Sequence, residues 1–431
     1  MTVYIVLAAS LIFLIIIGVP VGFGVGISSI VGIAYFFGGF TDQRVSIMLA
    51  RLAYQKMDDF LLLAIPFFLL AGRLMNTGGV TDRLFNFVSL FVRPVRGGLA
   101  HANVLGSVLF AGMSGSATAD IVGPGAVELR AMVNQGYSKN FSAGITAASS
   151  LIGPIIPPSI ALVAYAVVAG ESVAALFTAG IAVGLLMAFV FILYVAYCAR
   201  RYNFPRGTIP SLKEAWVAFR RGFLPLLTPV IILGGIYGGI FTPTEAAAVA
   251  AFYAMFLGLF VFREYGLQRL LAEVRATMID TAVIMIIVAF TSSFGVVMIR
   301  GQVPQALANF MAHLTSNPTV LLLLFLILWL IVGCFMSQTP AILILTPILL
   351  PTAQQFGIDS VHFGLVMTTA LTLGLLTPPV GMVLYALVRV SGISFEELVR
   401  ICIPYIILMV GVVVIIILFP QFVLFLPKIL L

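Results

Sequence analysis

Two short stretches rich in small hydroxyl residues lie in otherwise apolar sequence. GMSGSATAD covers residues 112–120, and GCFMSQTPA covers residues 333–341. Each interrupts an apolar run, at 98–130 and 319–354, and each predicts two half-length helices that meet at a tip, a re-entrant hairpin. Hydroxyl and carbonyl oxygens are hard ligands suited to Na⁺, and free amide groups at helix ends suit a carboxylate. The tips therefore indicate the binding of ions rather than covalent chemistry.

The apolar runs that follow the two tips are themselves broken by proline pairs. SSLIGPIIPPSI at 149–160 contains the pair 157–158, and LGLLTPPVGM at 373–382 contains the pair 378–379. Proline removes a backbone donor and clashes with the preceding turn, which costs about 3 kcal/mol in a helix interior. Carbonyls freed inside hydrocarbon need a ligand, an ion, water or another segment. Simple kinks between packed helices are the alternative, but four breaks in corresponding places favour a site.

The residues around these four breaks are the candidate ligands. As ligands for Na⁺ we expect Ser114, Ser116, Ser149, Ser150, Gly153, Pro154, Gly333, Ser337, Thr372, Gly374, Thr377 and Pro378. As substrate-binding residues we expect Ser114, Gly115, Ser116, Thr118, Pro158, Ser337, Gln338, Thr339 and Pro379. Asp120 follows the first tip in apolar sequence and is a further functional candidate. The equal alternative is that Asp120 ties the hairpin to a neighbouring serine or backbone amide.

The composition places these stretches in a membrane protein. Of 431 residues, 62% are hydrophobic and only 9% are charged, with a mean hydropathy of +1.19. Such values exclude an ordinary soluble domain and predict a polytopic helical membrane protein. The apolar runs are 3–18, 21–40, 60–76, 98–130, 140–169, 173–198, 222–241, 245–262, 278–299, 319–354, 360–388 and 398–427. The net charge of +7 lies in loops between them, so it biases topology and does not indicate nucleic-acid binding.

Enzyme and metal motifs are missing from the sequence. There is no GxSxG elbow, HExxH helix or phosphate-binding GxxxxGK[ST] loop, so we expect no catalytic residues and no enzyme. Cys198, Cys334 and Cys402 lie far apart without metal-ligand spacing, as do the three histidines. We expect no cofactor except Na⁺ as a coupling ion. Transport without a nucleotide motif depends on an ion gradient or on a separate ATPase.

The chain also resembles itself. LMNTGGVTDRLFNF at 74–87 matches VMIRGQVPQALANF at 297–310 at six positions. A hairpin and then a proline-broken helix follow each copy, with Gly112 and Gly333 in equivalent places. Five crossings separate the two copies, so they have opposite orientations, which is the inverted-repeat plan of secondary transporters. We predict an all-α polytopic protein with inverted repeats and two re-entrant hairpins, divided at 1–59, 60–170, 171–277, 278–388 and 389–431.

Positive charges fix the predicted orientation. The segment 198–221 carries five arginines and one lysine against a single glutamate, so it is expected in the cytoplasm. The 41–58 loop then lies outside, and both termini face the periplasm. The start of the chain, 1–22, lacks the charged region of a cleaved signal peptide and is interpreted as the first membrane helix.

Several polar residues have structural interpretations. In FTPTEAAA at 241–248, Thr242 and Glu245 form a capping box with Pro243 at the first helical position. Ser394 and Glu397 repeat that arrangement before the last helix. Arg300 ends a helix, and we expect its side chain to extend to the membrane interface.

At GMSGSATAD, LIGPIIPPSI, FTPTEAA and LGLLTPPVGM, the chain resembles the large, DctM-like membrane subunit of tripartite ATP-independent periplasmic (TRAP) transporters over essentially its whole length. The resemblance implies sodium-driven uptake of an organic acid across a bacterial inner membrane. It also implies two partners, a small four-helix membrane subunit and a periplasmic substrate-binding protein. The implied mechanism is an elevator, in which 60–170 and 278–388 move against a scaffold formed by the first two helices, 173–262 and 398–427.

One departure from the family concerns the second tip. Many relatives carry an acid where this chain has Met336, Ser337 and Gln338. Sialic acid and C4-dicarboxylates are both common cargo in such systems, and the missing arginine at either tip favours helix dipoles as carboxylate partners. A gated channel and an ion-coupled anion transporter without a binding protein are the competing interpretations. Two inverted hairpins in one chain argue against the channel, because channels form their filters from several subunits.

Overall fold

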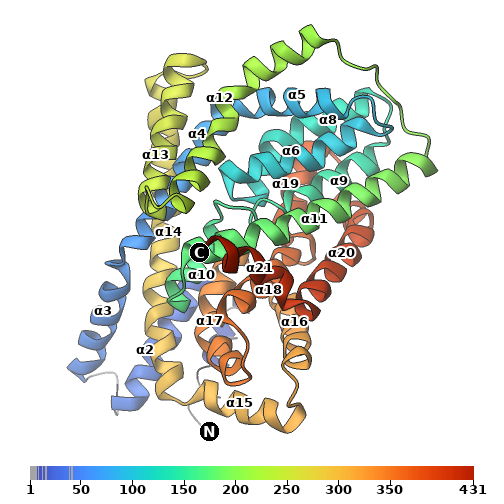
Figure 1. Ribbon diagram of the computed structural model, residues 1–431. Helices are drawn as coiled ribbons and strands as arrows, with labels where there is room; N and C mark the ends of the chain where they lie inside the picture. The colour runs from blue at the N-terminus through green and yellow to red at the C-terminus, as the bar shows by residue number, and fades with distance from the viewer. Residues whose placement is uncertain (1–6, 8, 12, 15–16, 38, 40–41) are drawn as a thin grey trace.

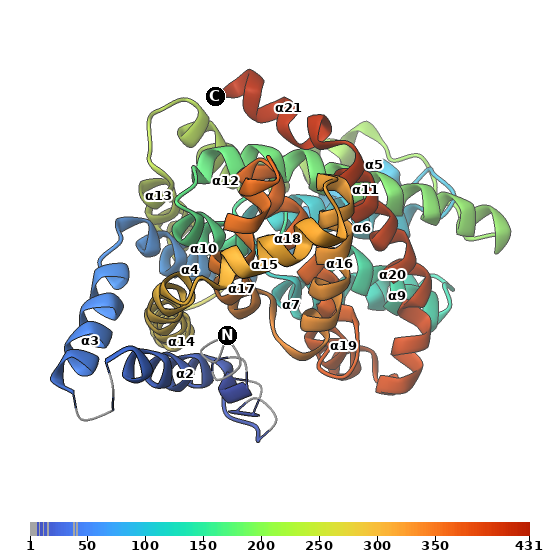
Figure 2. The same cartoon turned by 90° about the horizontal axis from the view of Figure 1, so that it is seen from below.

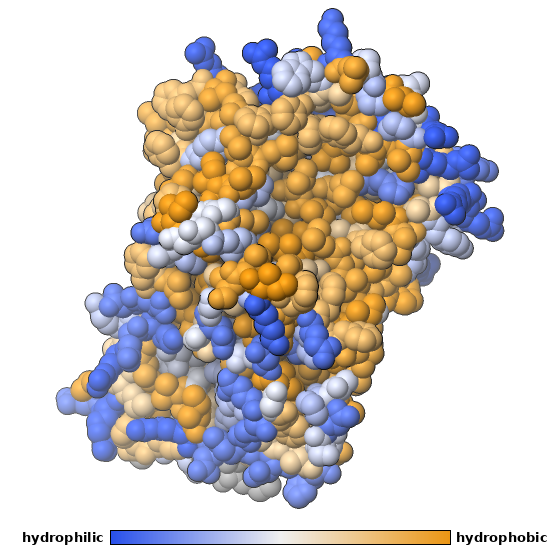
Figure 3. Space-filling model, in the orientation of Figure 1, coloured by the Kyte–Doolittle hydropathy of each residue, from blue (hydrophilic) through white to orange (hydrophobic). Residues whose placement is uncertain are grey.

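Helices form the regular structure throughout the described part of the chain. The computed structural model describes all residues except 1–6, 8, 12, 15–16, 38 and 40–41. Half of the positions of the predicted first membrane helix at 3–18 lie outside the described residues, and of the others 7, 9–11 and 13–14 are helical. Seven of the described helices are long and apolar enough to cross a membrane. Figure 3 shows a broad apolar surface between charged side chains at the two ends, as a bilayer requires.

The predicted repeats appear as two series of helices. Before the first series lie α2 (Val21–Phe37) and α3 (Gln43–Met57). The first series contains η1 (Phe60–Leu63), α4 (Ala64–Thr77), α5 (Val80–Val92), α6 (Gly98–Ser114), α7 (Ala117–Asp120), η2 (Ile121–Gly125), α8 (Ala126–Asn134), α9 (Lys139–Ser150) and α10 (Ile160–Ala169). The second contains α14 (Leu267–Arg300), α15 (Val303–Leu314), α16 (Pro318–Phe335), α17 (Gln338–Gln355), α18 (Ser360–Leu373), η4 (Gly374–Leu376) and α19 (Met382–Ser391).

Further helices join and follow the two series. Between them lie α11 (Val173–Arg201), α12 (Leu212–Tyr237), α13 (Pro243–Phe256) and η3 (Leu257–Val261). The chain ends with α20 (Phe395–Leu418) and α21 (Pro420–Leu430), so the predicted single run at 398–427 breaks at Phe419. The Thr242–Glu245 capping box is confirmed in both directions. Ser394 caps α20, but Glu397 accepts a hydrogen bond from Asn140 (3.0 Å).

Both hairpins and both breaks are confirmed. α6 contacts α7 and α8, and α16 contacts α17, so each pair doubles back at its tip. α9 and α10 are separated by turns at 151–158, and α18 and α19 by η4 and by a bend and turn at 377–380. Figure 1 places α5, α6 and α8 toward its upper end and α15, α16 and α17 toward its lower end. The hairpins therefore approach each other from opposite ends, as inverted repeats require.

The prediction of a loop at 41–58 is wrong. Its residues form α3, which Asp42 begins by accepting a hydrogen bond from the Arg44 amide (2.8 Å). This helix packs against α2 and α14. Its charged residues stand among apolar ones, so one face packs on neighbours while the other faces outward, and a search for long apolar runs misses such an amphipathic helix. α5 and α15 were missed for the same reason.

Helix contacts form two groups, which meet where α4 packs against α6 and α14 packs against α17. α4 packs against α13 and α14, and α14 packs against α2 and α3. α11 instead packs against α6, α9 and α18, and α20 packs against α9 and α18, all of which belong to the hairpin and broken-helix part. Viewed from below, α2, α3 and α14 lie on one side, and α16, α19 and α20 lie on the other (Figure 2).

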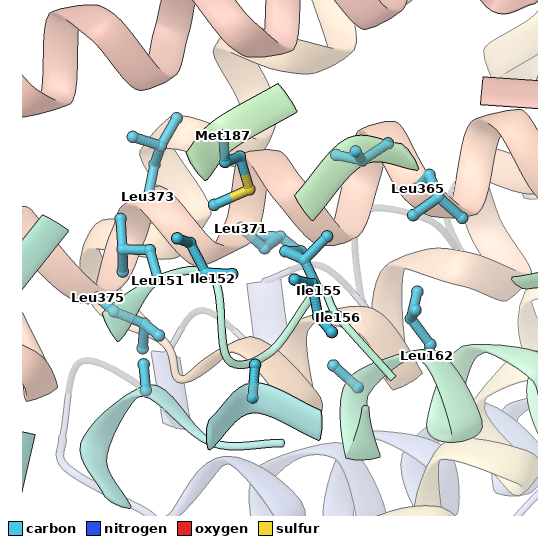
Figure 4. Packing of buried hydrophobic residues seen from close by; sticks show 14 of the residues in the cluster. Leu151, Ile152, Ile155, Ile156, Leu162, Met187, Leu365, Leu371, Leu373 and Leu375 are labelled. Atoms are coloured by element: carbon cyan, nitrogen blue, oxygen red, sulfur yellow. The ribbon is translucent and has the colours of Figure 1, made fainter. Parts of the chain in front are cut away.

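The first break lies at the centre of the main core. Leu151, Ile152 and Ile155 are fully buried in the turns between α9 and α10. They belong to one apolar cluster with Leu371 and Leu373 of the second break (Figure 4). Met187 of α11 extends into the same cluster. Apolar packing from both repeats thus fixes the broken segments, which have little helical hydrogen bonding of their own.

Candidate functional site

A cavity of about 340 Å³ lies between the two hairpin tips. Its lining includes predicted residues from both tips and the first break: Gly115, Ser116, Thr118, Pro154, Ser337, Gln338 and Thr339. The opposite wall belongs to α14, with Asp280, Val283, Ile284 and Ile287. The volume is that of a small-molecule site, and most of its lining is apolar with a few convergent polar groups. The structure therefore brings the sequence-predicted tips together around one chamber.

The first tip is a tight turn held against neighbouring backbone. Gly115 has a φ of +59°, and a Cβ there would collide with the carbonyl oxygen of Pro158. Ser116 caps the short helix α7, and its hydroxyl lies 3.1 Å from that of Thr118. A side chain at Gly72 of α4 would press on the backbone of the same tip. Glycine is therefore needed where α4 and the tip approach so closely.

Asp120 and Ser114 form a buried pair behind the first tip. The Ser114 hydroxyl donates to Oδ1 of Asp120 at 2.6 Å, and Asp120 is only 2% exposed. Oδ2 of Asp120 has no hydrogen-bond partner within the described residues. That oxygen faces Gly153 in the first break, because a Cβ on Gly153 would lie 2.9 Å from it. A buried carboxylate oxygen without a donor is costly unless a cation or proton meets it.

A second buried carboxyl group lies further along the first hairpin, and sequence reasoning missed it. Asn103 donates to Oε2 of Glu128 at 2.6 Å and to Thr146 at 2.9 Å. The predicted ligand Ser149 donates to the side-chain oxygen of Asn103 at 2.7 Å. Oε1 of Glu128 lacks a partner in the part of the chain that the structure describes. The sequence pattern that could have revealed this site is the presence of Asn103 and Glu128 within the apolar run 98–130.

The second tip holds an amide where the first holds a carboxylate. Gln338 donates through Nε2 to the hydroxyl of Thr372 at 2.6 Å and to the carbonyl of Thr368 at 3.1 Å. Thr377 donates to the Gly374 carbonyl at 3.1 Å and accepts a weak bond from Cys334. The hydroxyl oxygen of Thr372, which is a predicted cation ligand, thus already accepts a hydrogen bond from the Gln338 amide.

The remaining predicted residues lie away from the cavity. Ser150 donates to the Ala147 carbonyl at 2.8 Å, within its own helix. Gly333 and Gly374 touch through their backbones, where a side chain on either would collide with the other. Both proline pairs contain a cis peptide bond. The first pair, with Pro158, is buried, whereas the second, with Pro379, is exposed.

An ion-pair network beside the cavity was also missed. Arg73 of α4 pairs with Asp280 of α14, and it lies 3.6 Å from Glu273 of the same helix. Thr77 donates to Glu273 at 3.0 Å. Asp280 is the one charged side chain that lines the cavity within the described residues. The sequence pattern that could have revealed it is a single charged residue in each of two apolar runs, 60–76 and 278–299. Charged residues are rare in membrane helices, so such a residue marks a functional region.

The first set of predicted ligands fits a cation better than the second. It offers a buried carboxylate with an open oxygen, together with serine oxygens and an unwound backbone. The second set offers hydroxyl and carbonyl oxygens that the Gln338 amide engages. Among the described residues there is no group of three or more His, Cys, Asp or Glu for a transition metal.

Inverted hairpins, paired breaks and a central polar cavity define a secondary transporter of the membrane. Residues 8–422 match the family "Tripartite ATP-independent periplasmic transporter, DctM component". The chain belongs to this family, whose members are transporter permeases.

Named relatives of similar length support the assignment. The sialic acid TRAP transporter large permease SiaM of Vibrio cholerae is 41% identical over 411 residues, covering 95% of each protein. The C4-dicarboxylate TRAP transporter large permease DctM of Pseudomonas aeruginosa is 40% identical over 380 residues, covering 88% of this chain and 89% of the relative.

A solved structure shares the fold at low sequence identity. The YdaH transporter of Alcanivorax borkumensis matches with a TM-score of 0.62 at 16% identity, covering 89% of this chain and 90% of that one. The all-helical membrane fold predicted from the sequence is thereby confirmed.

Proposed function

We propose that this protein takes up an organic acid across the bacterial inner membrane, driven by a sodium gradient. The observation that carries the proposal is the cavity of about 340 Å³ between the two tips, lined by Ser116, Thr118, Ser337, Gln338 and Thr339. Hydroxyl groups and free helix ends at this place suit a carboxylate and the hydroxyl groups of a small acid. The similarity to permeases for sialic acid and for C4-dicarboxylates supports these two substrates.

The proposed sodium site lies behind the first tip. When bound there, Na⁺ would balance the buried charge of Asp120, with Ser114 and the backbone near Gly153 and Pro154 completing the site. The Ser149 hydroxyl donates a hydrogen bond to the side-chain oxygen of Asn103 at 2.7 Å, which directs this hydroxyl away from the proposed site. A second sodium at Ser337, Thr372, Gly374 and Thr377 requires that Gln338 turn away, because its amide now bonds to the Thr372 hydroxyl.

The substrate carboxylate is proposed to point to the tips rather than to α14. Asp280 is negative and lines the α14 wall, so it would repel a carboxylate but accept bonds from hydroxyl groups. Arg73 pairs with Asp280 and limits that repulsion. Replacing Asp280 with Asn is therefore expected to alter sialic acid transport more than succinate transport.

We propose an elevator mechanism with a division that follows the packing. This division differs from the one predicted from the sequence at 60, 171, 278 and 389, which put α4 and most of α14 in the moving part and α11 and α20 in the scaffold. Because α4 and α14 pack with α2, α3 and α13, we place them in the scaffold. Because α11 and α20 pack with the hairpins and broken helices, we place them in the moving part. The close contact of Gly72 with the first tip would then be one place where the two parts slide.

The proposed partners follow from the tripartite family. They are a small four-helix membrane subunit and a periplasmic binding protein that delivers the substrate. Both termini are proposed to face the periplasm, since the arginine-rich segment 198–221 is placed in the cytoplasm.

Uptake into proteoliposomes tests the proposal. Liposomes holding this chain and its small subunit should accumulate labelled sialic acid or succinate only with an inward sodium gradient and the cognate binding protein. A potassium gradient of equal size is the control. Uptake without the binding protein would instead support an independent anion transporter. Ion conductance without accumulation would support a channel.

A further inference from the structure

A large basic cleft lies at the end of the molecule that carries α5 and the first turns of α12. Its volume is about 1610 Å³, and it shares no lining residue with the central cavity. Three acidic side chains line it, against six basic ones: Arg83, Arg93, Arg206, Lys213, Arg220 and Arg221. The cleft is therefore a positively charged pocket, and the transport proposal uses none of these residues.

The positive charge of the cleft is only partly neutralised from within, because three acidic side chains face six basic ones. Glu264 is occupied by Arg83 at 2.8 Å, and Glu214 accepts the Ser211 backbone amide at 2.9 Å in a capping box. Arg93, Lys213, Arg220 and Arg221 form no ion pair with any carboxylate that the structure describes. These four cations share the cleft with the carboxylates of Asp82 and Glu214, and with six basic against three acidic side chains the lining keeps a formal charge of +3.

Hydrogen bonds fix one wall of the cleft. The amide of Gly207 donates to the Arg93 carbonyl at 3.0 Å, and the amide of Gly97 donates to the Pro205 carbonyl at 3.1 Å. Arg206 donates to the Pro94 carbonyl at 2.6 Å. These bonds join the turn after α5 to the segment between α11 and α12. These bonds therefore fix the backbone at Arg93 and the side chain of Arg206, and the exposed Arg93 side chain extends from this fixed backbone.

One face of α12 forms the other wall. Lys213, Trp216, Arg220 and Leu224 follow helical spacing, so they share a face, and all of them line the cleft. The outer edge is apolar and open: Leu212 is 91% exposed and Trp216 is 66% exposed. Trp216 is followed along α12 by Phe219, on which it stacks, and by Phe223, whose ring is tilted against that of Phe219. Such an arrangement joins a cationic pocket to an apolar strip that leads into a membrane-spanning helix.

We propose that this cleft binds the headgroup of an anionic phospholipid. Its phosphate lies between Arg93 and the Arg220–Arg221 pair, since arginine binds phosphate oxygens in a bidentate manner. Its acyl chains follow Trp216 and the phenylalanines toward the bilayer. Basic pockets between membrane helices bind acidic lipids in this way. A bound lipid adds to the packing of the first turns of α12 on α5, where Phe219 already meets Phe87.

Tryptophan fluorescence provides the test, because the chain has only two tryptophans and Trp329 is fully buried. In the Trp329→Phe variant of the full chain, Trp216 is the single reporter. We expect brominated phosphatidylglycerol in neutral detergent micelles to quench it at much lower lipid fraction than brominated phosphatidylcholine. The preference should fall about fivefold for each arginine lost from the cleft.

Matched arginine pairs supply the control. Arg220→Gln with Arg221→Gln should remove the preference, whereas Arg200→Gln with Arg201→Gln, an adjacent pair outside the cleft, should keep it. Arg93→Gln on the other wall should weaken it on its own, and circular dichroism confirms that each variant is folded. Equal quenching by both lipids overturns the proposal. Loss of quenching on adding inorganic phosphate at millimolar concentration assigns the cleft to a soluble anion and also overturns it. Displacement of the lipid by the small membrane subunit assigns the cleft to a protein interface, with the same consequence.

Discussion

The two repeats share a backbone plan but differ in what lies behind their tips. Aligning Gly112 with Gly333 and Pro157 with Pro378 places Ala341 opposite Asp120. The same alignment pairs three further polar residues of the first repeat with apolar ones of the second: Asn103 with Leu324, Glu128 with Leu349 and Ser149 with Ala370. The first repeat therefore contains a buried polar cluster, and the second has apolar side chains at the corresponding positions.

The two repeats thus share the shape of the backbone but not the buried charge. Duplication preserves the breaks because the backbone needs glycine and proline at the same places. Charge is not needed twice, since one buried carboxylate already provides a strong cation ligand. The second tip uses the neutral Gln338 amide, whose bonds to Thr368 and Thr372 need no ion. The proposed sodium dependence should therefore come mainly from the first repeat.

The largest expected effect is that of Asp120→Asn. It removes the negative charge behind the first tip, and a lost bond to a charged group costs roughly 2–3 kcal/mol, or about 100-fold in the half-saturating sodium concentration. Sodium titration of sialic acid uptake in proteoliposomes measures it. Ser114→Ala keeps the carboxylate but removes one proposed ligand, so it should raise the same concentration by only about fivefold, the worth of one hydrogen bond of about 1 kcal/mol. An unchanged sodium titration for Asp120→Asn would remove the contrast between the repeats.

Gln338→Glu should bring the second repeat closer to the first. A carboxylate there would face the Thr372 and Thr368 oxygens that now accept from the amide, so it requires a cation or a proton. We expect the sodium dependence of uptake to become steeper and the half-saturating concentration to change by about tenfold, or roughly 1.4 kcal/mol. Gln338→Ala separates loss of the amide from gain of charge. The same sodium dependence in both variants would contradict the idea.

Ser116→Ala and Ser337→Ala compare the tips directly, because the two residues are equivalent in the alignment and both line the cavity. Ser116 also caps α7, whereas Ser337 makes no capping bond. We expect Ser116→Ala to raise the half-saturating sodium concentration about fivefold, the worth of one hydrogen bond of about 1 kcal/mol. Ser337→Ala should raise only the half-saturating substrate concentration, by a similar factor. If the two variants exchange these effects, the assignment of sodium to the first tip fails.

Glu128→Gln should have the smallest effect, less than about twofold on uptake, because the amide oxygen still accepts from Asn103. Glu128→Leu copies the second repeat at Leu349 and leaves the buried Asn103 without this acceptor. It should lower the free energy of unfolding by about 1–3 kcal/mol, seen as a lower thermal midpoint of the purified protein. Abolished uptake in Glu128→Gln would show that the charge of Glu128 is needed for transport.

Much of the fold was predictable because breaks in a membrane helix are chemically conspicuous. Proline pairs and glycine-rich tips cannot continue a helix, so the runs at 98–130 and 319–354 indicated hairpins directly. α3, α5 and α15 were missed because they are amphipathic and short. Their apolar faces pack on other helices, a property that hydropathy along the chain does not record.

The site was predictable at the tips and less so behind them. Ser116, Thr118 and Gln338 lie in the motifs themselves, and the structure places them at the cavity. The Arg73–Asp280 pair joins residues 207 positions apart, and no local pattern indicates such a pairing. The role of Asn103, which bridges Glu128 and Ser149, likewise depends on helix packing.

The buried first break has a consequence for heat stability. Leu151, Ile152 and Ile155 share one apolar core with Leu371 and Leu373 of the other repeat. Neither copy can lose its packing without exposing the interior of the other. On heating, the two repeats should therefore melt in one cooperative calorimetric transition.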